Sequence, residues 1–134
     1  MDHIASMTDS SVYELCKVHR GRLHFCIISI ELDSLPGSNS VLCDIDLVDR
    51  VPVRALISDA MAGIALFFRK HANELPNDGF RVYIKDIQST TVDTYPDDGR
   101  VSSYMAMFKL IFPDKKEPEL RYMTEGEVWY IGGQ

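Results

Sequence analysis

The sequence predicts an α+β domain: an antiparallel sheet of four to six strands with one long helix packed on one face. Residues 53–75 carry the first observation, because their apolar side chains recur with the 3.6-residue period of an amphipathic helix. Segments rich in β-branched and aromatic residues lie on both sides of that helix and predict strands. Short connections containing Pro, Gly and Asp separate the later segments and favour antiparallel pairing. With 134 residues, of which 46% are hydrophobic, the chain suits one compact domain that is stable without disulfides.

The elements before the long helix are predicted from turn signals and alternation. Residues 1–10 are expected to form a flexible tail, which leaves 11–134 as the single domain. The segment 11–19 is compatible with a short helix, capped by Asp9 or Ser10, or with the start of a strand. Residues 22–32 predict a strand that is apolar on both faces over part of its length, which is typical of a central strand. Residues 41–48 alternate and predict a strand with one wet face.

The long helix is predicted over residues 53–75 and ends before Pro76 and Gly79. Its apolar face comprises Leu56, Ile57, Ala60, Met61, Ile64, Phe67, Phe68 and Leu75. Residues 79–93 return to strand, with a slip of phase near Asp86 and Ile87 that suggests a bulge. The rest of the chain is assigned to a hairpin loop at 94–100, a strand at 101–112, and one or two strands at 120–131 interrupted near 124–126.

One helix covers one face of a sheet, so the opposite face needs a second cover. The residues assigned to that face are Tyr83, Met105, Met107 and Trp129. The N-terminal segment, a second copy in a homodimer, or a protein partner could each supply the cover. Aromatic and Met side chains are enriched at interface cores, so these four residues are the predicted partner-binding residues. Burial of the same side chains by the N-terminal segment is an equally weighted alternative.

Charge and composition bear on the partners and the compartment. The net charge of −6 argues against a nucleic-acid partner, because phosphate binding needs a concentrated positive surface. It is compatible with a basic protein partner, although solubility alone is the better-supported reason for it. No run approaches the ~20 apolar residues of a membrane span, and the N-terminus lacks the pattern of a secretion signal. Three cysteines without C-x-x-C spacing predict reduced thiols in a cytoplasmic protein.

No motif in the sequence predicts catalysis, a metal or a cofactor. Two acidic groups are candidate cation ligands, but an ordinary wet strand face and a hairpin tip are the favoured interpretations. They are Asp44, Asp46 and Asp49, and then Asp93, Asp97 and Asp98. His24 and Cys26 share one strand face but lie about 7 Å apart, which is too far for a catalytic pair and favours core packing. His71 lies near the helix C-terminus, where packing or capping is the favoured role.

The order of HFCIISIELDSLPGS, a proline-led helix and GFRVYIKDI resembles domain four of the translocation elongation factor over about half of the chain. The resemblance ends after Asp93, because that family continues into a second helix whereas this chain predicts a strand. The acidic charge also fits ribosome contact poorly, so the chain is not assigned to that family.

Two functions are compatible with these observations. The preferred one is a small acidic protein-binding module, an adaptor, inhibitor or immunity-type protein, acting by surface complementarity as a monomer or a homodimer. The absence of a catalytic constellation and the half-exposed apolar sheet face favour it over an enzyme. The alternative is a small enzyme or ligand-binding domain whose site is assembled from distant residues, for instance His24, His71, Asp86 and Tyr104.

Overall fold

The structure of the chain is a computed structural model that describes residues 9–34, 37, 39–43, 45–49, 53–75, 79–90 and 92–132. Its strands are β1 (Asp9–His19), β2 (Arg22–Ser34), β3 (Ser40–Cys43), β4 (Phe80–Ser89), β5 (Leu120–Met123) and β6 (Val128–Ile131). Its helices are α2 (Ile45–Val48), α3 (Val53–Lys70) and α4 (Asp98–Ile111), and a short 3₁₀ helix spans Ala72–Glu74. The fold is therefore α+β, as the sequence predicts.

The main sheet has four strands in the order β1-β2-β4-β3. β1 and β2 form an antiparallel hairpin whose turn contains Arg20 and Gly21, both with positive φ. β2 pairs antiparallel with β4, while β3 is parallel to β4 and reaches it through α2 and α3. β5 and β6 form a separate antiparallel pair. The sheet is thus mostly antiparallel, and β2 is a central strand as predicted.

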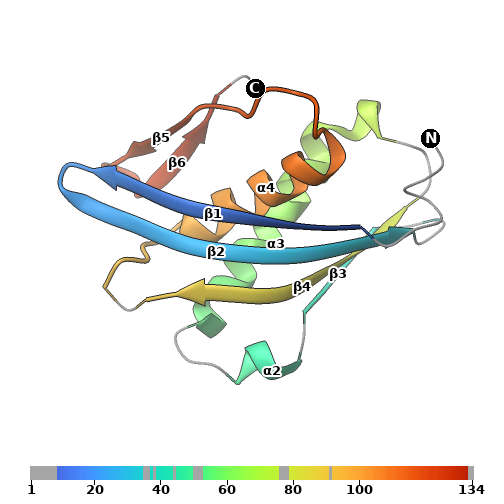
Figure 1. Cartoon of the computed structure of the whole chain (residues 1–134), viewed down its shortest axis with the longest axis horizontal. Coiled ribbons are helices and arrows are strands. Elements are labelled where there is room, and N and C mark those ends of the chain that lie inside the picture. The colour runs from blue at the N-terminus through green and yellow to red at the C-terminus, as the bar shows by residue number, and fades with distance from the viewer. Residues whose placement is uncertain are drawn as a thin grey trace.

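Helices α3 and α4 pack on each other and lie on one side of the sheet (Figure 1). The apolar face predicted for the long helix packs into the core: Ile64 and Phe67 have no exposed surface, while Met61, Phe68 and Leu75 are partly buried. Alternate residues of β2, including His24 and Cys26, face the helices and complete the core. No helix in the described ranges covers the other face of the sheet (Figure 1).

The predicted slip of phase in β4 is a β-bulge. Ser29 pairs with Asp86 and Ile30 pairs with Ile84, so Lys85 is an extra residue in β4. A bulge inserts one residue into a strand and reverses the alternation of the residues that follow. This is why Ile87 is buried like Ile84, although three positions separate them.

The prediction of a strand over residues 101–112, and with it of one long helix, was wrong. All of these residues except Phe112 belong to helix α4, which packs on α3, and Val101 to Phe108 are all buried. α4 contacts α3, β1, β2 and β6, so it needs apolar side chains on every side. A segment that is apolar all round shows a two-residue period as readily as a helical one, and the sequence pattern could not separate them. After β4 the chain therefore continues into a second helix, as the elongation-factor module does.

Three smaller expectations also change. Of the two alternatives for the segment 11–19, the strand is correct and the short helix is wrong. The strand predicted at 41–48 ends at Cys43, and helix α2 follows. The predicted four to six strands are four strands in one sheet and two in another. Of the predicted tail, Asp9 and Ser10 belong to β1, and residues 1–8 lie outside the described residues.

Two observations bear on the expected compartment. None of the helices in the described part of the chain is long and apolar enough to cross a membrane. All three cysteines are free thiols, and burial raises the pKa of Cys26 to about 12. The cytoplasmic location stays a prediction.

Candidate functional site

Distant segments meet at the end of the sheet that carries the β1–β2 turn. His24 lies near the start of β2 on the helix side and is 2% exposed. Asp98 is the first residue of α4 and has no exposed surface. Although the two residues are 74 positions apart, the Nδ1 atom of His24 lies 2.8 Å from the Oδ1 atom of Asp98. This buried pair is the centre of the candidate site.

The Asp98 carboxylate accepts hydrogen bonds from three directions. The indole Nε1 of Trp129 donates to Oδ1 at 2.8 Å, and the backbone N–H of Tyr95 donates to Oδ2 at 2.8 Å. A carboxylate is only an acceptor, so the Nδ1 atom of His24 carries the proton in its bond to Asp98. The other ring nitrogen, Nε2, has no hydrogen-bond partner among the described residues. Nε2 is therefore the polar atom of this pair that remains available to a ligand.

Aromatic rings fix the orientation of the imidazole. The ring centroids of Tyr122, Tyr95 and Trp129 lie 4.3, 4.7 and 5.3 Å from that of His24. Burial, followed by the negative charges of Glu127 and Asp98, raises the pKa of the Tyr122 phenol. The phenol is therefore neutral at physiological pH and can donate or accept a hydrogen bond.

A cavity of about 300 Å³ lies against the imidazole. It is lined by His19, Arg20, Arg22, His24, Tyr95, Tyr122, Thr124 and Glu127. The two arginines flank Gly21 in the β1–β2 turn, and neither has an ion-pair partner among the described residues. His19 Nε2 lies 2.9 Å from Thr124 Oγ1 and joins the end of β1 to the β5–β6 connection. Two arginines and one glutamate, Glu127, thus contribute to the lining of the cavity.

Trp129 attaches the β5–β6 hairpin to the N-terminus of α4. Its backbone N–H donates to the Asp97 carboxylate, and its carbonyl accepts from Nη2 of Arg100 at 2.8 Å. Arg100 also forms an ion pair with Asp97, which has a left-handed backbone with φ of 75°. A non-glycine residue in that region is uncommon and is held there by its surroundings. These bonds fix the hairpin that supplies Tyr122, Thr124 and Glu127 to the cavity.

The structure separates the predicted partner-binding residues. Met105, Met107 and Trp129 are 1%, 0% and 4% exposed, whereas Tyr83 is half-buried on the outward face of β4. The two methionines are buried because they lie on α4 and not on a strand. Partner binding through the four residues stays a prediction, but in this structure only Tyr83 is accessible.

The four residues named for the alternative site do not converge. His71 and Tyr104 are brought together, with Nε2 and Oη 2.8 Å apart, and Oε1 of Glu74 lies 2.6 Å from Nδ1 of the same imidazole. They lie beside a second cavity, lined by Lys115 and Glu119 among others. His24 belongs to the cluster with Asp98, and Asp86 lies on β4.

The structure also shows where Cys26 and most of the aspartates of the two acidic groups lie. Burial keeps the Cys26 thiol protonated, which agrees with core packing beside His24. Asp44 lies outside the described residues, while Asp46 and Asp49 are exposed. Within the described ranges no three His, Cys, Asp or Glu side chains are placed to hold a metal ion. Asp98, assigned to a hairpin tip, is instead the buried partner of His24, and no local signal in the sequence indicates that pairing.

The fold and site define an α+β domain with two helices on one sheet face and a polar cavity bounded by a β-hairpin. No protein-family model matches the chain, and no curated protein matches it. Among solved structures it is similar to a Thermus thermophilus protein designated ttk003000868, with a TM-score of 0.63 and 13% sequence identity. The match covers 78% of this chain but only 16% of that chain. At this identity the likeness shows the fold alone.

Proposed function

We propose that the chain is a small-molecule-binding domain whose site is the cavity beside His24. The observation that carries this proposal is the His24–Asp98 pair, which fixes the imidazole and, among the described residues, leaves Nε2 without a partner at the cavity wall. Ligand sites place a small number of oriented polar groups beside aromatic side chains. Tyr95 and Tyr122 provide the rings, and His24 provides the oriented polar atom.

The energetics of burial support the same conclusion. A buried histidine and a buried carboxylate lose their hydration, and a well-packed apolar pair is often as stable or more stable. The bonds from Trp129 and from the Tyr95 backbone give Asp98 a structural role, but they do not require an imidazole as its third donor. A ligand that bonds to Nε2 gives a reason for the imidazole. This assignment favours the ligand-binding alternative of the sequence analysis over its preferred function.

The proposal is tested with the intrinsic fluorescence of Trp129, which is the single tryptophan of the chain and contacts His24. A library of single-ring fragments is screened by this fluorescence, and hits are followed by amide chemical shifts. Hits should shift the signals of Gly21, Arg22, Thr124 and the Trp129 indole N–H. The signals of Lys115 and Lys116, beside the His71 cavity, serve as the internal control. A screen without hits, or hits that shift only the control signals, would contradict the proposal.

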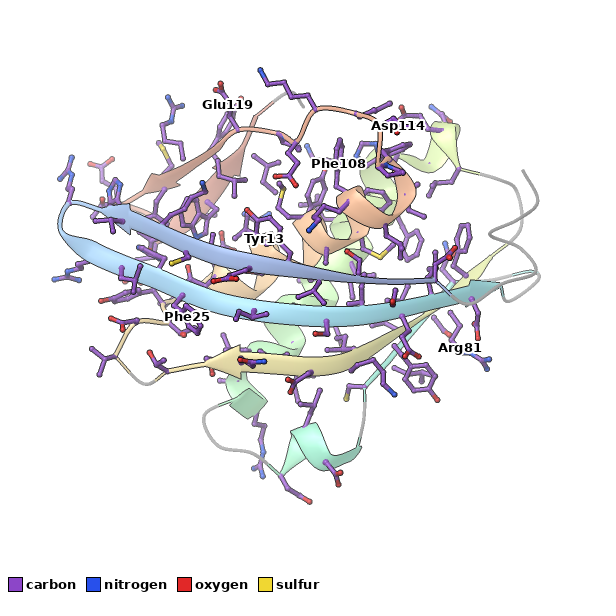
Figure 2. The ribbon with its side chains drawn as sticks, viewed as in Figure 1. Tyr13, Phe25, Arg81, Phe108, Asp114 and Glu119 are labelled. Carbon is purple, nitrogen blue, oxygen red and sulfur yellow. The ribbon has the colours of Figure 1, made fainter. Side chains whose placement is uncertain are left out.

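A second candidate function, the protein-binding module, is favoured by the sheet face that none of the described helices covers. Apolar residues of β1 and β2 form a strip there, consisting of Cys16, Val18, Leu23, Phe25 and Ile27. Val18 is 69% exposed, and Phe25 lies toward the turn end of the face, while Arg81 lies toward the other end (Figure 2). Cys16 and Val18 are exposed and the other three residues are partly exposed, and contiguous apolar surface marks interaction sites more often than isolated residues do.

The protein-binding function predicts self-association or binding of a hydrophobic dye through this strip. Size-exclusion chromatography with light scattering and dye fluorescence should both respond to Phe25→Ser. Met123→Ser, which removes an exposed apolar side chain from the hairpin, is the matched control. A monomer at all concentrations that binds no dye counts against this function.

A further inference from the structure

We propose that the cavity beside His24 binds a small organic anion, a single flat ring that carries one carboxylate or phosphate group. This inference rests on the proposed ligand-binding function and adds the chemical class of the ligand. It follows from the charges, the rings and the size of the cavity.

The charges on the cavity wall favour an anion. Arg20 and Arg22 both line the cavity, and among the described residues neither guanidinium group is neutralised by an ion pair. Guanidinium groups bind carboxylate and phosphate oxygens through paired hydrogen bonds. The Asp98 carboxylate adds negative charge beside the cavity, but its oxygens accept from His24, Trp129 and the Tyr95 backbone, so it is not paired with either guanidinium group.

Glu127 is the one acidic side chain among the described residues that lines the cavity, and it opposes an anionic ligand. It is exposed and lies in the β5–β6 connection with φ of 50°. Among the side chains that line the cavity, two arginines outnumber one glutamate, although the whole chain carries a net charge of −6. The local excess of positive charge therefore differs in sign from the protein as a whole.

The rings and the volume limit the body of the ligand. Tyr95 and Tyr122 both line the cavity and both contact the His24 ring. Aromatic side chains favour a flat ring as a partner, in offset or edge contact. A volume of about 300 Å³ is at the small end of ligand pockets, which run from roughly 300 to 1,000 Å³. The cavity therefore suits one ring and not a nucleotide.

The test compares matched ligands with the full chain. Trp129 fluorescence or calorimetry measures the Kd of 4-hydroxybenzoate, phenyl phosphate and the neutral 4-hydroxybenzamide. We expect at least one anion to bind about tenfold or more tightly than the amide, which is the effect of one charge-assisted hydrogen bond. The preference for carboxylate or phosphate identifies which oxyanion the site takes.

Variants of exposed residues test whether the preference for an anion depends on the residues that line the cavity. Arg22→Gln should weaken binding of the better anion by about tenfold, and Glu127→Gln should strengthen it severalfold. Arg121→Gln removes the same charge from the exposed face of β5 and should leave the Kd unchanged. All three positions are exposed, so the fold should be retained.

The outcomes separate this inference from the function on which it rests. If the amide binds as tightly as both anions, or if Arg22→Gln and Arg121→Gln have the same effect on the Kd, the proposed preference for an anion is wrong. The proposed ligand-binding function is then not contradicted. If none of the three compounds binds and the fragment screen also fails, both proposals are wrong. If none of the three compounds binds but neutral fragments from the screen do, only the proposed preference for an anion is wrong.

Discussion

Asp59 shows how one carboxylate responds to its position between the two helices. It lies on α3, and its Oδ2 atom accepts the backbone N–H of Asp97 at 3.1 Å. Burial raises the pKa of Asp59, and the charges of Asp97 and Asp98 raise it further, while the Asp97 bond and Arg100 lower it. In sum the pKa is above its ordinary value of 3.8, so ionised Asp59 opposes folding.

The sign of this shift gives a prediction for Asp59→Asn. A carboxyl group with a raised pKa in the folded state stabilises the fold only below its unfolded pKa, and the contribution is lost as the pH rises through the folded value. The Asn variant should therefore be more stable than the wild type at pH 7, and the gain should disappear at about pH 3. Its amide oxygen can still accept the Asp97 N–H.

Urea denaturation at the two pH values measures this difference in the free energy of unfolding. Asp114→Asn, at an exposed position after α4, is the control and should change stability little at either pH. An equal effect of Asp59→Asn at both pH values would show that its ionisation is not the cause.

At the same scale, the candidate site shows what single residues can and cannot reveal. The alternation of β2 correctly predicts that His24 faces the same side as Cys26, toward the core. Its partner Asp98 has only the signal of a turn, because a carboxylate at the start of a helix looks the same in sequence whether it is exposed or buried. Pairing across 74 positions depends on the tertiary fold, which no local pattern encodes.

At the scale of elements, the contact between α3 and α4 depends on Gly63. A Cβ atom at this position would lie 2.1 Å from the carbonyl oxygen of Arg100 and 2.1 Å from Oγ of Ser103. The Ser103 hydroxyl donates to the carbonyl of Ala60 at 2.7 Å, which places the two helices in direct contact. Small residues allow helix backbones to approach this closely.

Gly63→Ala should therefore destabilise the domain, although alanine is the better helix former. Overpacking of this kind costs about 1–3 kcal/mol, which exceeds the gain of roughly 0.5–1 kcal/mol in helix propensity. Thermal unfolding should show a Tm lower by several degrees. Ala65→Gly, at an exposed position of α3, measures the propensity contribution alone. A more stable Gly63→Ala variant would mean that the helices are not in close contact at Gly63.

The two helices also differ in how well their sequences predict them. One side of α3 is exposed to solvent, so its apolar residues recur with a helical period. The sequence therefore predicts the position of this helix correctly. α4 is buried on every side, and the period is lost. The sequence pattern could therefore not predict that residues 98–111 form helix α4 or that this helix packs against the core; the three-dimensional structure shows both. The same error placed Met105 and Met107 on a sheet face.

At the scale of the whole molecule, the β5–β6 hairpin is a unit attached to the main domain. It shares no strand pairing with the four-stranded sheet among the described residues. An isolated two-stranded hairpin is marginally stable in water, so its order depends on its contacts with the domain. Trp129 provides the bonds to Asp97, Asp98 and Arg100. Loss of one of these bonds should therefore destabilise the hairpin more than the main sheet.

Trp129→Phe removes the indole N–H while it keeps an aromatic ring and both backbone bonds. The Asp98 oxygen then loses a donor in a buried site, at a cost of about 1–3 kcal/mol. Hydrogen exchange should become faster in the hairpin, from Leu120 to Ile131, with a much smaller change in β2 and β4, because local opening does not require global unfolding. Tyr130→Phe, at the exposed neighbour that is 51% accessible, is the matched control and should leave exchange unchanged. Equal acceleration in the hairpin and in the main sheet would instead show that the two form one cooperative unit. Because the hairpin supplies part of the cavity wall, the same variant should also weaken ligand binding in proportion to the opened fraction.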